Sequence, residues 1–339
     1  MATLRDIAVR ASVSISTASR ALSGHHHVQD ETRKRIQTIA RELGYVPNSM
    51  ARGLRRNQTR TIGVLIPDMR NSSFSSESAV LLQRKFQELG YGTVLYVTGY
   101  DRETELRCID RLRFQQVDGV LRVPTSAMSV DVLNAGPRSI PVLEFLRRSQ
   151  AERYDGVLYD DEEGAYRVME HLIHLGHRRI GVITGPPETS STKRRLSGAE
   201  RALVAAGLGP KALRVVHGEY SPAAGHRAFE TLMAVEPPVT AVFATSAQFV
   251  LGVAMAAKEQ NVLIPQRVSL AAFGDPEWGQ LISPPLTTYT LPLPEMAMTA
   301  ALLLTSRIEK GPPEDGRPVR IWISGDLVVR GSTAPPGGL

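Results

Sequence analysis

Small hydroxyl side chains gather near the start of the chain, with one long cation among them. Residues 11–24 read ASVSISTASRALSG and contain five serines, one threonine and Arg20. Hydroxyl groups donate hydrogen bonds to phosphate oxygens at short range, and a guanidinium can bind a phosphate or the O6 and N7 atoms of guanine. This stretch therefore indicates contact with nucleic acid. The alternative is that the serines only cap helices and face solvent, as serine commonly does.

Positive charge is concentrated in the same region. Residues 1–60 carry eleven basic and four acidic side chains, a net charge of +7, whereas the whole chain carries +6. The remaining 279 residues therefore have a net charge of −1. A short basic domain attached to a nearly neutral body is typical of proteins that bind nucleic acid.

The elements that would position these side chains are three short helices. Apolar spacing predicts helices over residues 3–11, 14–22 and 30–43, with Thr3 and Ser14 as N-caps and Gly44 as the stop of the third. Only Ser12 and Val13 separate the first two helices. Two helices joined by so short a turn predict a helix-turn-helix, whose second helix enters the DNA major groove.

A marginal helix is expected after this domain. Residues 47–60 begin with Pro47 and contain Gly53, which weakens an isolated helix. Leu54 stands between Gly53 and Arg55, so it could act as a wedge in a minor-groove base step while the basic residues contact phosphates. The alternative is that Leu54 packs on the neighbouring domain.

Three motifs resemble the lac/gal repressor family of bacterial transcription regulators: TLRDIAVRASVSISTASRAL, VQDETRKRIQTIARELGYVPNSMARGLR and TIGVLIPD. The resemblance runs from Thr3 to about Ser332. It implies a homodimer whose headpieces read a pseudo-palindromic operator in double-stranded DNA, without a cofactor or a metal. By position, the residues implied to read bases are Ile15, Ser16 and Arg20, those implied to hold the DNA backbone are Thr3, Ser14, Ser19, His27 and Asn48, and Leu54 is the implied lever. Arg52, close to Leu54, is a further DNA-binding candidate. Ile15 departs from the polar or aromatic residue of many relatives, although an aliphatic side chain can contact a thymine methyl group.

From residue 61 onward, short apolar runs alternate with helical patterns. Examples are IGVLIP, GTVLYV, DGVLRV and PVLEF, and the alternation restarts with DGVLYD and RRIGVIT. Such alternation predicts parallel, doubly wound sheets with helices on both faces, and the length is sufficient for two lobes. We therefore predict an all-α headpiece over 1–46, a hinge helix over 47–60, a periplasmic-binding-protein-like α/β core over 61–332 and a tail over 333–339.

Ligands of such folds bind at the carboxyl ends of the strands, here between the lobes. The candidate effector-binding residues are Asn71, Ser73, Phe74, Asp160, Arg195, Tyr220, Ser246 and Asp275. The resemblance implies that Arg195 grips effector oxygens and that Tyr220 stacks against the ligand. Each of these side chains could instead be an ordinary loop or helix-surface residue.

Two departures from the family bear on the effector. Ser246 and Ala247 replace an Asn-Asp pair, and Gly274 replaces an Asp, so two acceptors for sugar hydroxyls are missing. A neutral hexose is therefore a poorer fit than a sugar acid, for which Arg195 supplies a counter-charge. The expected effector is a sugar, a sugar acid or a related metabolite, and Arg195 leaves an anionic effector open.

Other function classes find less support. Cys108 is the single cysteine and is expected to be a buried apolar residue, which fits a reducing cytoplasm. The sequence has no signal-peptide pattern, no membrane span and no catalytic nucleophile motif, and the three histidines at 25–27 are expected in a solvated loop. A solute-binding protein of a transport system and an enzyme on the same scaffold are the alternatives. The short tail favours a dimer over a tetramer.

Overall fold

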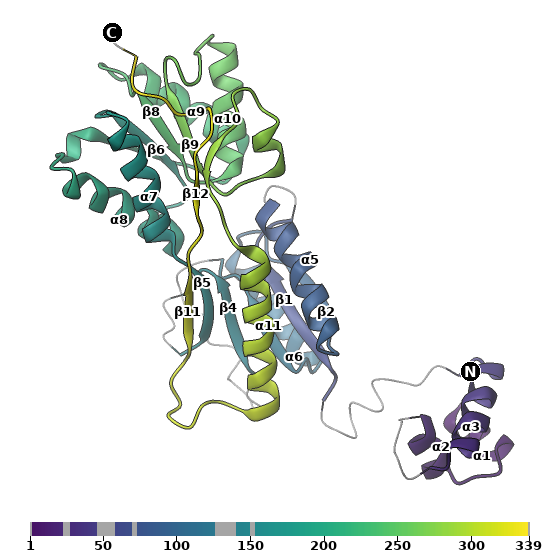
Figure 1. Cartoon of the computed structure of the whole chain (residues 1–339). Coiled ribbons are helices and arrows are strands. Elements are labelled where there is room, and N and C mark those ends of the chain that lie inside the picture. The colour runs from purple at the N-terminus through teal and green to yellow at the C-terminus, as the bar shows by residue number, and fades with distance from the viewer. Residues whose placement is uncertain are drawn as a thin grey trace. The chain divides into compact units, whose positions relative to one another are not determined.

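The chain forms two compact units, Met1–Thr59 and Arg60–Leu339. The computed structural model describes residues 2–22, 28–45, 58–69, 73–125, 140–149 and 153–337. Figure 1 gives the element labels used below.

The N-terminal unit contains three helices in its described residues. They are α1 (Leu4–Arg10), α2 (Ile15–Leu22) and α3 (Asp30–Glu42). Ile7, Ala18 and Ile36, one from each helix, are fully buried and close the core. The small alanines let the helices approach closely, and Ser12 adopts a left-handed backbone with φ of 53° in the turn between α1 and α2. Gly44 ends the third helix with φ of 59°, as its sequence position predicted.

The second unit begins with the lobe that we call lobe 1. Its six-stranded sheet has the order β11-β5-β4-β3-β1-β2 and is parallel throughout. The strands are β1 (Thr61–Ile66), β2 (Gly92–Val97), β3 (Gly119–Arg122), β4 (Val142–Leu146), β5 (Asp155–Tyr159) and β11 (Arg320–Ile323). The helices are α5 (Ser73–Glu88), α6 (Arg102–Phe114) and α11 (Leu293–Lys310). Successive strand residues point to opposite faces, so Ile62 and Val64 pack with α5 and α11, whereas Leu65 packs with Ile109 of α6.

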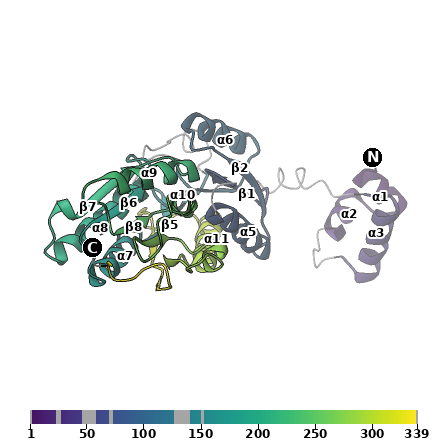
Figure 2. The ribbon, with the colours of Figure 1, turned by 90° about the horizontal axis from the view of Figure 1, so that it is seen from above.

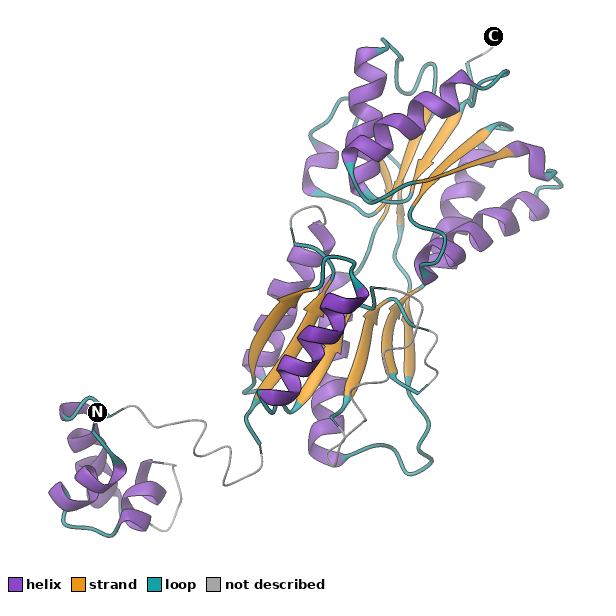
Figure 3. Ribbon diagram, turned by 180° about the vertical axis from the view of Figure 1, so that it is seen from behind, coloured by secondary structure: helices purple, strands orange, loops and turns teal. Residues whose placement is uncertain are grey.

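Lobe 2 repeats this plan. Its sheet has the order β12-β10-β9-β8-β6-β7, and only the β10–β12 pair is antiparallel. The strands are β6 (Ile180–Thr184), β7 (Leu213–His217), β8 (Ala241–Ala244), β9 (Ser269–Phe273), β10 (Thr287–Tyr289) and β12 (Leu327–Val328). The α-helices are α7 (Asp161–His174), α8 (Ser190–Ala205), α9 (Pro222–Ala234) and α10 (Ala247–Glu259), and two 3₁₀ turns are η2 (Pro210–Ala212) and η3 (Glu277–Gln280). Helices α7 and α8 share one apolar cluster with the sheet, and α9 and α10 share the cluster on its other face. Figure 3 shows both sheets in orange between their helices.

The described chain passes between the lobes three times. It leaves lobe 1 after β5, returns after β10 to build α11 and β11, and leaves again to add β12 to lobe 2. Figure 2 shows the core from above, with α5 and α11 close together. The two parallel α/β lobes predicted from the sequence are confirmed, whereas α10, α11, β10, β11 and β12 were not predicted. Thr333 and Ala334, placed in the predicted tail, hydrogen-bond to His171 and His177 of lobe 2.

Candidate functional site

The exposed face of α2 carries the side chains predicted to read bases. Ile15 is 50% exposed at the first position of the helix, although an aliphatic side chain favours burial. Ser16 and Arg20 are exposed along the same short helix, whereas Ala18 and Ala21 are buried against α1 and α3. Within the described residues no ion pair engages Arg20. The helix therefore presents an apolar group, a hydroxyl and a cation to solvent.

Two of the predicted backbone-binding residues also close helix ends. The Thr3 hydroxyl and backbone N–H both donate to Asp6 at 2.8 Å, and Asp6 N–H donates back to the hydroxyl, which completes a capping box. The backbone bond from Thr3, followed by its hydroxyl bond, lowers the pKa of Asp6. Ser14 Oγ accepts from Thr17 N–H at 3.0 Å. Ser19, on the same helix, is half-buried.

Five predicted site residues lie outside the described residues. They are His27, Asn48, Arg52, Leu54 and Asn71. Ser73 and Phe74 fall in the first turn of α5, where the structure describes the backbone only. Their predicted roles stay predictions.

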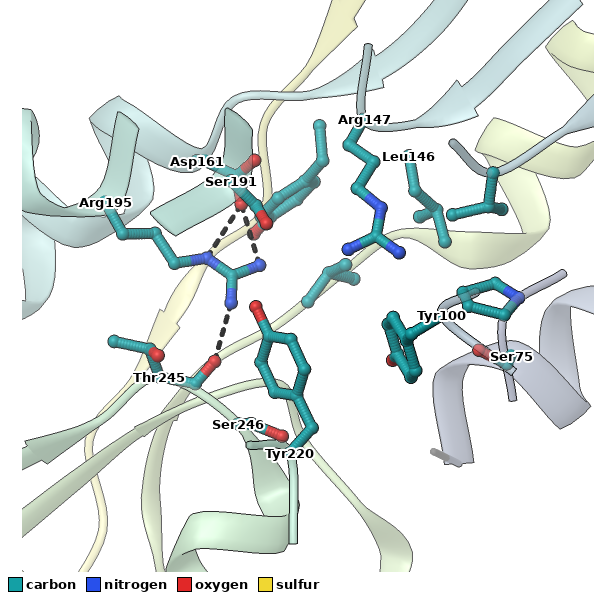
Figure 4. Close-up of a pocket in the computed structure, with 14 residues that line it drawn as sticks. Ser75, Tyr100, Leu146, Arg147, Asp161, Ser191, Arg195, Tyr220, Thr245 and Ser246 are labelled. Carbon is teal, nitrogen blue, oxygen red and sulfur yellow. Dashed lines mark hydrogen bonds and ion pairs between the residues drawn. The ribbon is translucent and has the colours of Figure 1, made fainter. Parts of the chain in front are cut away.

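A pocket lies between the two lobes at the carboxyl ends of their strands. It has a cavity volume of about 100 Å³ and is bounded by Pro67, Ser75, Tyr100, Val123, Leu146, Arg147, Tyr159, Asp161, Ser191, Arg195, Tyr220, Thr245, Ser246 and Leu291. Arg195, Tyr220 and Ser246, all predicted from the sequence, meet here. Figure 4 shows them converging from lobe 2.

Arg195 is held firmly on the lobe 2 side of this pocket. Its Nε and Nη2 contact Asp161 Oδ1 at 2.8 and 2.7 Å, and its Nη1 donates to the Thr245 carbonyl at 2.6 Å. The guanidinium also lies 3.9 Å from the centre of the Phe273 ring. Burial alone would lower the pKa of Arg195, but the Asp161 carboxylate raises it above its ordinary value. A charged, oriented guanidinium results.

Aromatic rings connect the lobes across the pocket. Tyr100, which follows β2 of lobe 1, stacks on Tyr220 of lobe 2 at 5.8 Å between ring centres. Tyr220 in turn stacks on Phe249 at 5.6 Å. Burial raises the pKa of the Tyr100 phenol, so this ring stays neutral at physiological pH. In this conformation the two tyrosine rings stack on each other at the wall of the pocket.

Two predicted effector residues do not line this pocket. Asp160 caps α7 and pairs with Arg194 at 3.1 Å. Asp275 pairs with Arg330 through both carboxylate oxygens, at 2.6 and 2.8 Å, and borders a separate hollow of about 770 Å³ with Glu77 and Trp278. Both carboxylates already have guanidinium partners at these sites.

The sequence analysis missed Tyr100, Arg147 and Asp161. Each lies within three residues of the end of a strand. The rule that ligands bind at the carboxyl ends of strands applies to every strand of both sheets. Applied to β2, β4 and β5 as well, it would have identified all three.

Comparisons with known proteins decide the family. Residues 3–48 match the model of bacterial regulatory proteins of the lacI family, and residues 169–333 match that of the periplasmic binding protein-like domain. The chain is 32% identical to the HTH-type transcriptional repressor CytR of Escherichia coli K12, over 98% of this chain and 96% of that protein. The chain belongs to the lacI family. It is also 32% identical to the ribose operon repressor of Haemophilus influenzae, over 94% and 95% of the two chains.

Solved structures of lacI-family proteins agree with this fold. The lac repressor dimer bound to operator and an anti-inducer is 24% identical, with a TM-score of 0.85 over 98% of this chain and 99% of that one. A complex of the regulator CelR with cellobiose is 27% identical, with a TM-score of 0.73 over 98% and 100%. This lacI-family chain is thus a DNA-binding transcription regulator with the two-lobed core predicted from its sequence.

None of the described helices is long and apolar enough to cross a membrane. In the same residues, no cluster of three or more histidine, cysteine or carboxylate side chains could hold a metal ion.

Proposed function

We propose that this lacI-family protein is a homodimeric repressor whose operator affinity is set by a sugar, sugar acid or related metabolite bound between its lobes. The observation that carries the proposal is the pocket into which Arg195 and Tyr220 of lobe 2 and Tyr100 of lobe 1 all project. A ligand there contacts both lobes, so its binding changes the free-energy difference between the open and the closed arrangement of the lobes. The operator and effector sites are thereby coupled.

On the DNA side, α2 enters the major groove with its N-terminal end first. Ile15, Ser16 and Arg20 contact base edges, and Thr3, Ser14, Ser19, His27, Asn48 and Arg52 hold the backbone. Leu54 inserts at the central minor-groove step. Ser14 accepts a hydrogen bond in its helix cap and keeps its hydroxyl proton for a phosphate, whereas Thr3 must release Asp6 before its hydroxyl can donate to DNA.

Assembly and location follow from this role. The matched lac repressor is a dimer bound to operator, and two half-sites require two headpieces. Exposed apolar side chains on the core, such as Val80 at 45% and Leu281 at 84% exposed, offer surface for self-association. We place the protein in the cytoplasm, where operator DNA lies, and we assign it a regulatory rather than an enzymatic role.

Selection of bound sequences from a random duplex library tests the proposal. The expected product is a pseudo-palindrome whose two halves are separated by an easily deformed central step. Enrichment of an asymmetric site, or of no site, would contradict it. The recovered operator, placed before a reporter gene, should reduce expression.

Single substitutions test which side chains of α2 contact DNA bases. Arg20→Gln should weaken operator binding by about 1–3 kcal/mol and relax preference at one position of each half-site. Arg41→Gln, the same charge change at the end of α3, serves as the control. Ile15→Ala should change preference at a neighbouring position while leaving the salt dependence of binding unchanged, because it removes no phosphate contact.

A further inference from the structure

Arg147 has an unsatisfied guanidinium in the effector pocket. Its Nε and Nη2 are buried and have no hydrogen-bond partner among the described residues. The side chain lies over the Tyr100 ring at 5.5 Å, and Figure 4 shows its guanidinium directed into the space beside Tyr100 and Leu146. Two buried donor nitrogens without partners on a half-buried cation are unfavourable in the free protein, so they indicate a missing hydrogen-bond acceptor.

The one carboxylate in the pocket lining, that of Asp161, is paired with Arg195 rather than with Arg147. Asp161 already receives two contacts from Arg195, at 2.7 and 2.8 Å. The charged residues that line the pocket are Arg147, Arg195 and Asp161, which leaves one positive charge in excess. One negative charge on a ligand balances the lining, whereas a phosphate dianion would reverse its sign.

The loop that carries Arg147 is rigidly built. Leu146 adopts a left-handed backbone with φ of 64°, which a non-glycine side chain rarely does, and Arg147 N–H donates to the Phe145 carbonyl at 2.7 Å. Two residues on, Ser149 donates from its N–H and its hydroxyl to Glu144, at 2.9 and 2.6 Å. Strained backbone of this kind persists where the surroundings fix it, and it concentrates at ligand sites.

Buried side chains of β3 and α6 hold the loop in place. Arg122 of β3 contacts Glu144 at 2.6 Å and Glu105 of α6 at 3.1 Å, and it also donates to Ser149 Oγ at 3.1 Å. Thr125 donates to Glu105 through its N–H and its hydroxyl. The backbone at Arg147 is therefore held in one conformation, which lowers the entropic cost of binding an anion.

We propose, building on the function above, that Arg147 binds the carboxylate of a hydroxylated monocarboxylic acid and that effectors of this protein belong to that class. Ser191, Tyr220 and Ser246 supply hydroxyls along the same pocket for the hydroxyl groups of the acid. A cavity of about 100 Å³ accommodates a carboxylate but not a whole sugar acid. The Tyr100–Tyr220 pair must separate to admit the remainder, which links binding to movement of the lobes.

Calorimetry on the full-length protein tests this assignment. The probes are D-gluconate, D-galactonate and D-glucuronate, their neutral counterparts D-glucose and D-galactose, and D-glucose 6-phosphate. We expect a monocarboxylate to bind on the order of 10–100-fold more tightly than its neutral counterpart, as a hydrogen bond to a charged group allows. Arg147→Gln should abolish this preference. Arg148→Gln, which alters the adjacent arginine outside the pocket lining, should retain it.

Three results would overturn the assignment. They are tighter binding of a neutral or phosphorylated probe, a carboxylate preference that survives Arg147→Gln, and the absence of Arg147-dependent carboxylate binding across the whole panel. Arg147→Met should also raise the melting temperature of the ligand-free protein relative to Arg148→Met, because it removes two buried donors without partners; a lower value would contradict the assignment.

Operator binding separates this inference from the proposed function. Arg147→Gln should bind the selected operator as the unchanged protein does and lose only the response to carboxylate. If the unchanged protein binds operator but no carboxylate, the inference fails alone. If it binds carboxylate through Arg147 but no operator, the proposed function fails alone.

Discussion

Lobe 1 and lobe 2 each hold an arginine in an ion pair with little or no solvent exposure, and the two arginines have different numbers of carboxylate partners. Arg122 of lobe 1 is 1% exposed and lies between two carboxylates, those of Glu105 and Glu144. Arg195 of lobe 2 has a single carboxylate partner, Asp161, and one side of it borders the pocket. Lobe 1 thus has an excess of buried acid around its arginine, whereas lobe 2 has a balanced pair.

This difference separates a structural role from a binding role. Arg122 has no contact with the pocket, and its partners connect α6, β3 and the loop after β4. Arg195 is oriented by Asp161 but remains next to the cavity, so a ligand can share its donors. A buried arginine surrounded by carboxylates indicates a structural role. An arginine at a cavity wall with a single carboxylate partner indicates a role in ligand binding.

The largest expected effect comes from Arg122→Met. It leaves two buried carboxylates facing each other without a cation, and we expect a loss of about 3–5 kcal/mol of unfolding free energy. Urea unfolding measures this loss for each lobe, because the two tryptophans of the chain lie one in each lobe, Trp322 in β11 and Trp278 in η3. The Trp278→Phe background reports lobe 1 alone.

Glu144→Gln is the matched control for Arg122→Met. It leaves the Arg122–Glu105 pair intact, so it should cost less than half as much. Equal losses would mean that the two acids act as one unit and that the contrast between the lobes is mistaken.

An intermediate effect is expected for Arg195→Met. It leaves Asp161 unpaired, but the pocket admits water and the carboxylate can take up a proton, since burial raises the pKa of Asp161. We expect a loss of about 1–3 kcal/mol in lobe 2, measured through Trp278 in a Trp322→Phe background. A loss as large as that of Arg122→Met would show that Arg195 is equally structural.

The smallest effect concerns pH and belongs to lobe 2. His177 is buried between Thr240, Ser269 and the Ala334 carbonyl, and burial lowers its pKa. The unfolded chain therefore takes up a proton first as pH falls below the ordinary histidine range near 6.5, and lobe 2 loses at most about 1.4 kcal/mol per pH unit until the folded pKa is reached.

The free energy of unfolding of lobe 2, measured at a series of pH values below 7, gives this slope. His177→Gln should reduce the slope and leave only the share of His171, whose pKa burial also lowers, and His174→Gln, at an exposed position of α7, should leave the slope unchanged. An undiminished slope in His177→Gln would assign the acid sensitivity to another group.

The sequence predicted the headpiece and the alternating core because both depend on local signals. Thr3, Ser14 and Gly44 mark helix ends, and the apolar runs mark strands buried on both faces. The C-terminal segments were harder to predict. Helix α11 packs in lobe 1 although the chain before it belongs to lobe 2, and periodicity does not record which sheet an element joins.

Two kinds of signal predicted pocket residues. Tyr220 and Ser246 follow strand ends, whereas Arg195 lies within α8 and was predicted from the family resemblance; all three lie at the pocket. Asp160 and Asp275 follow strand ends too, yet their carboxylates pair with Arg194 and Arg330. Such pairing depends on contacts between distant segments, as does the burial of Arg122 and Glu144 within otherwise apolar strands.

The three passages of the chain between the lobes also limit how the gene can be divided. Lobe 1 needs residues 61–159 together with 293–323, and lobe 2 is inserted between these segments and completed by β12. No single truncation releases either lobe whole. A chimera that exchanges effector specificity must therefore replace 161–289 as an internal cassette and bring a matching β12 with it, rather than join two halves end to end.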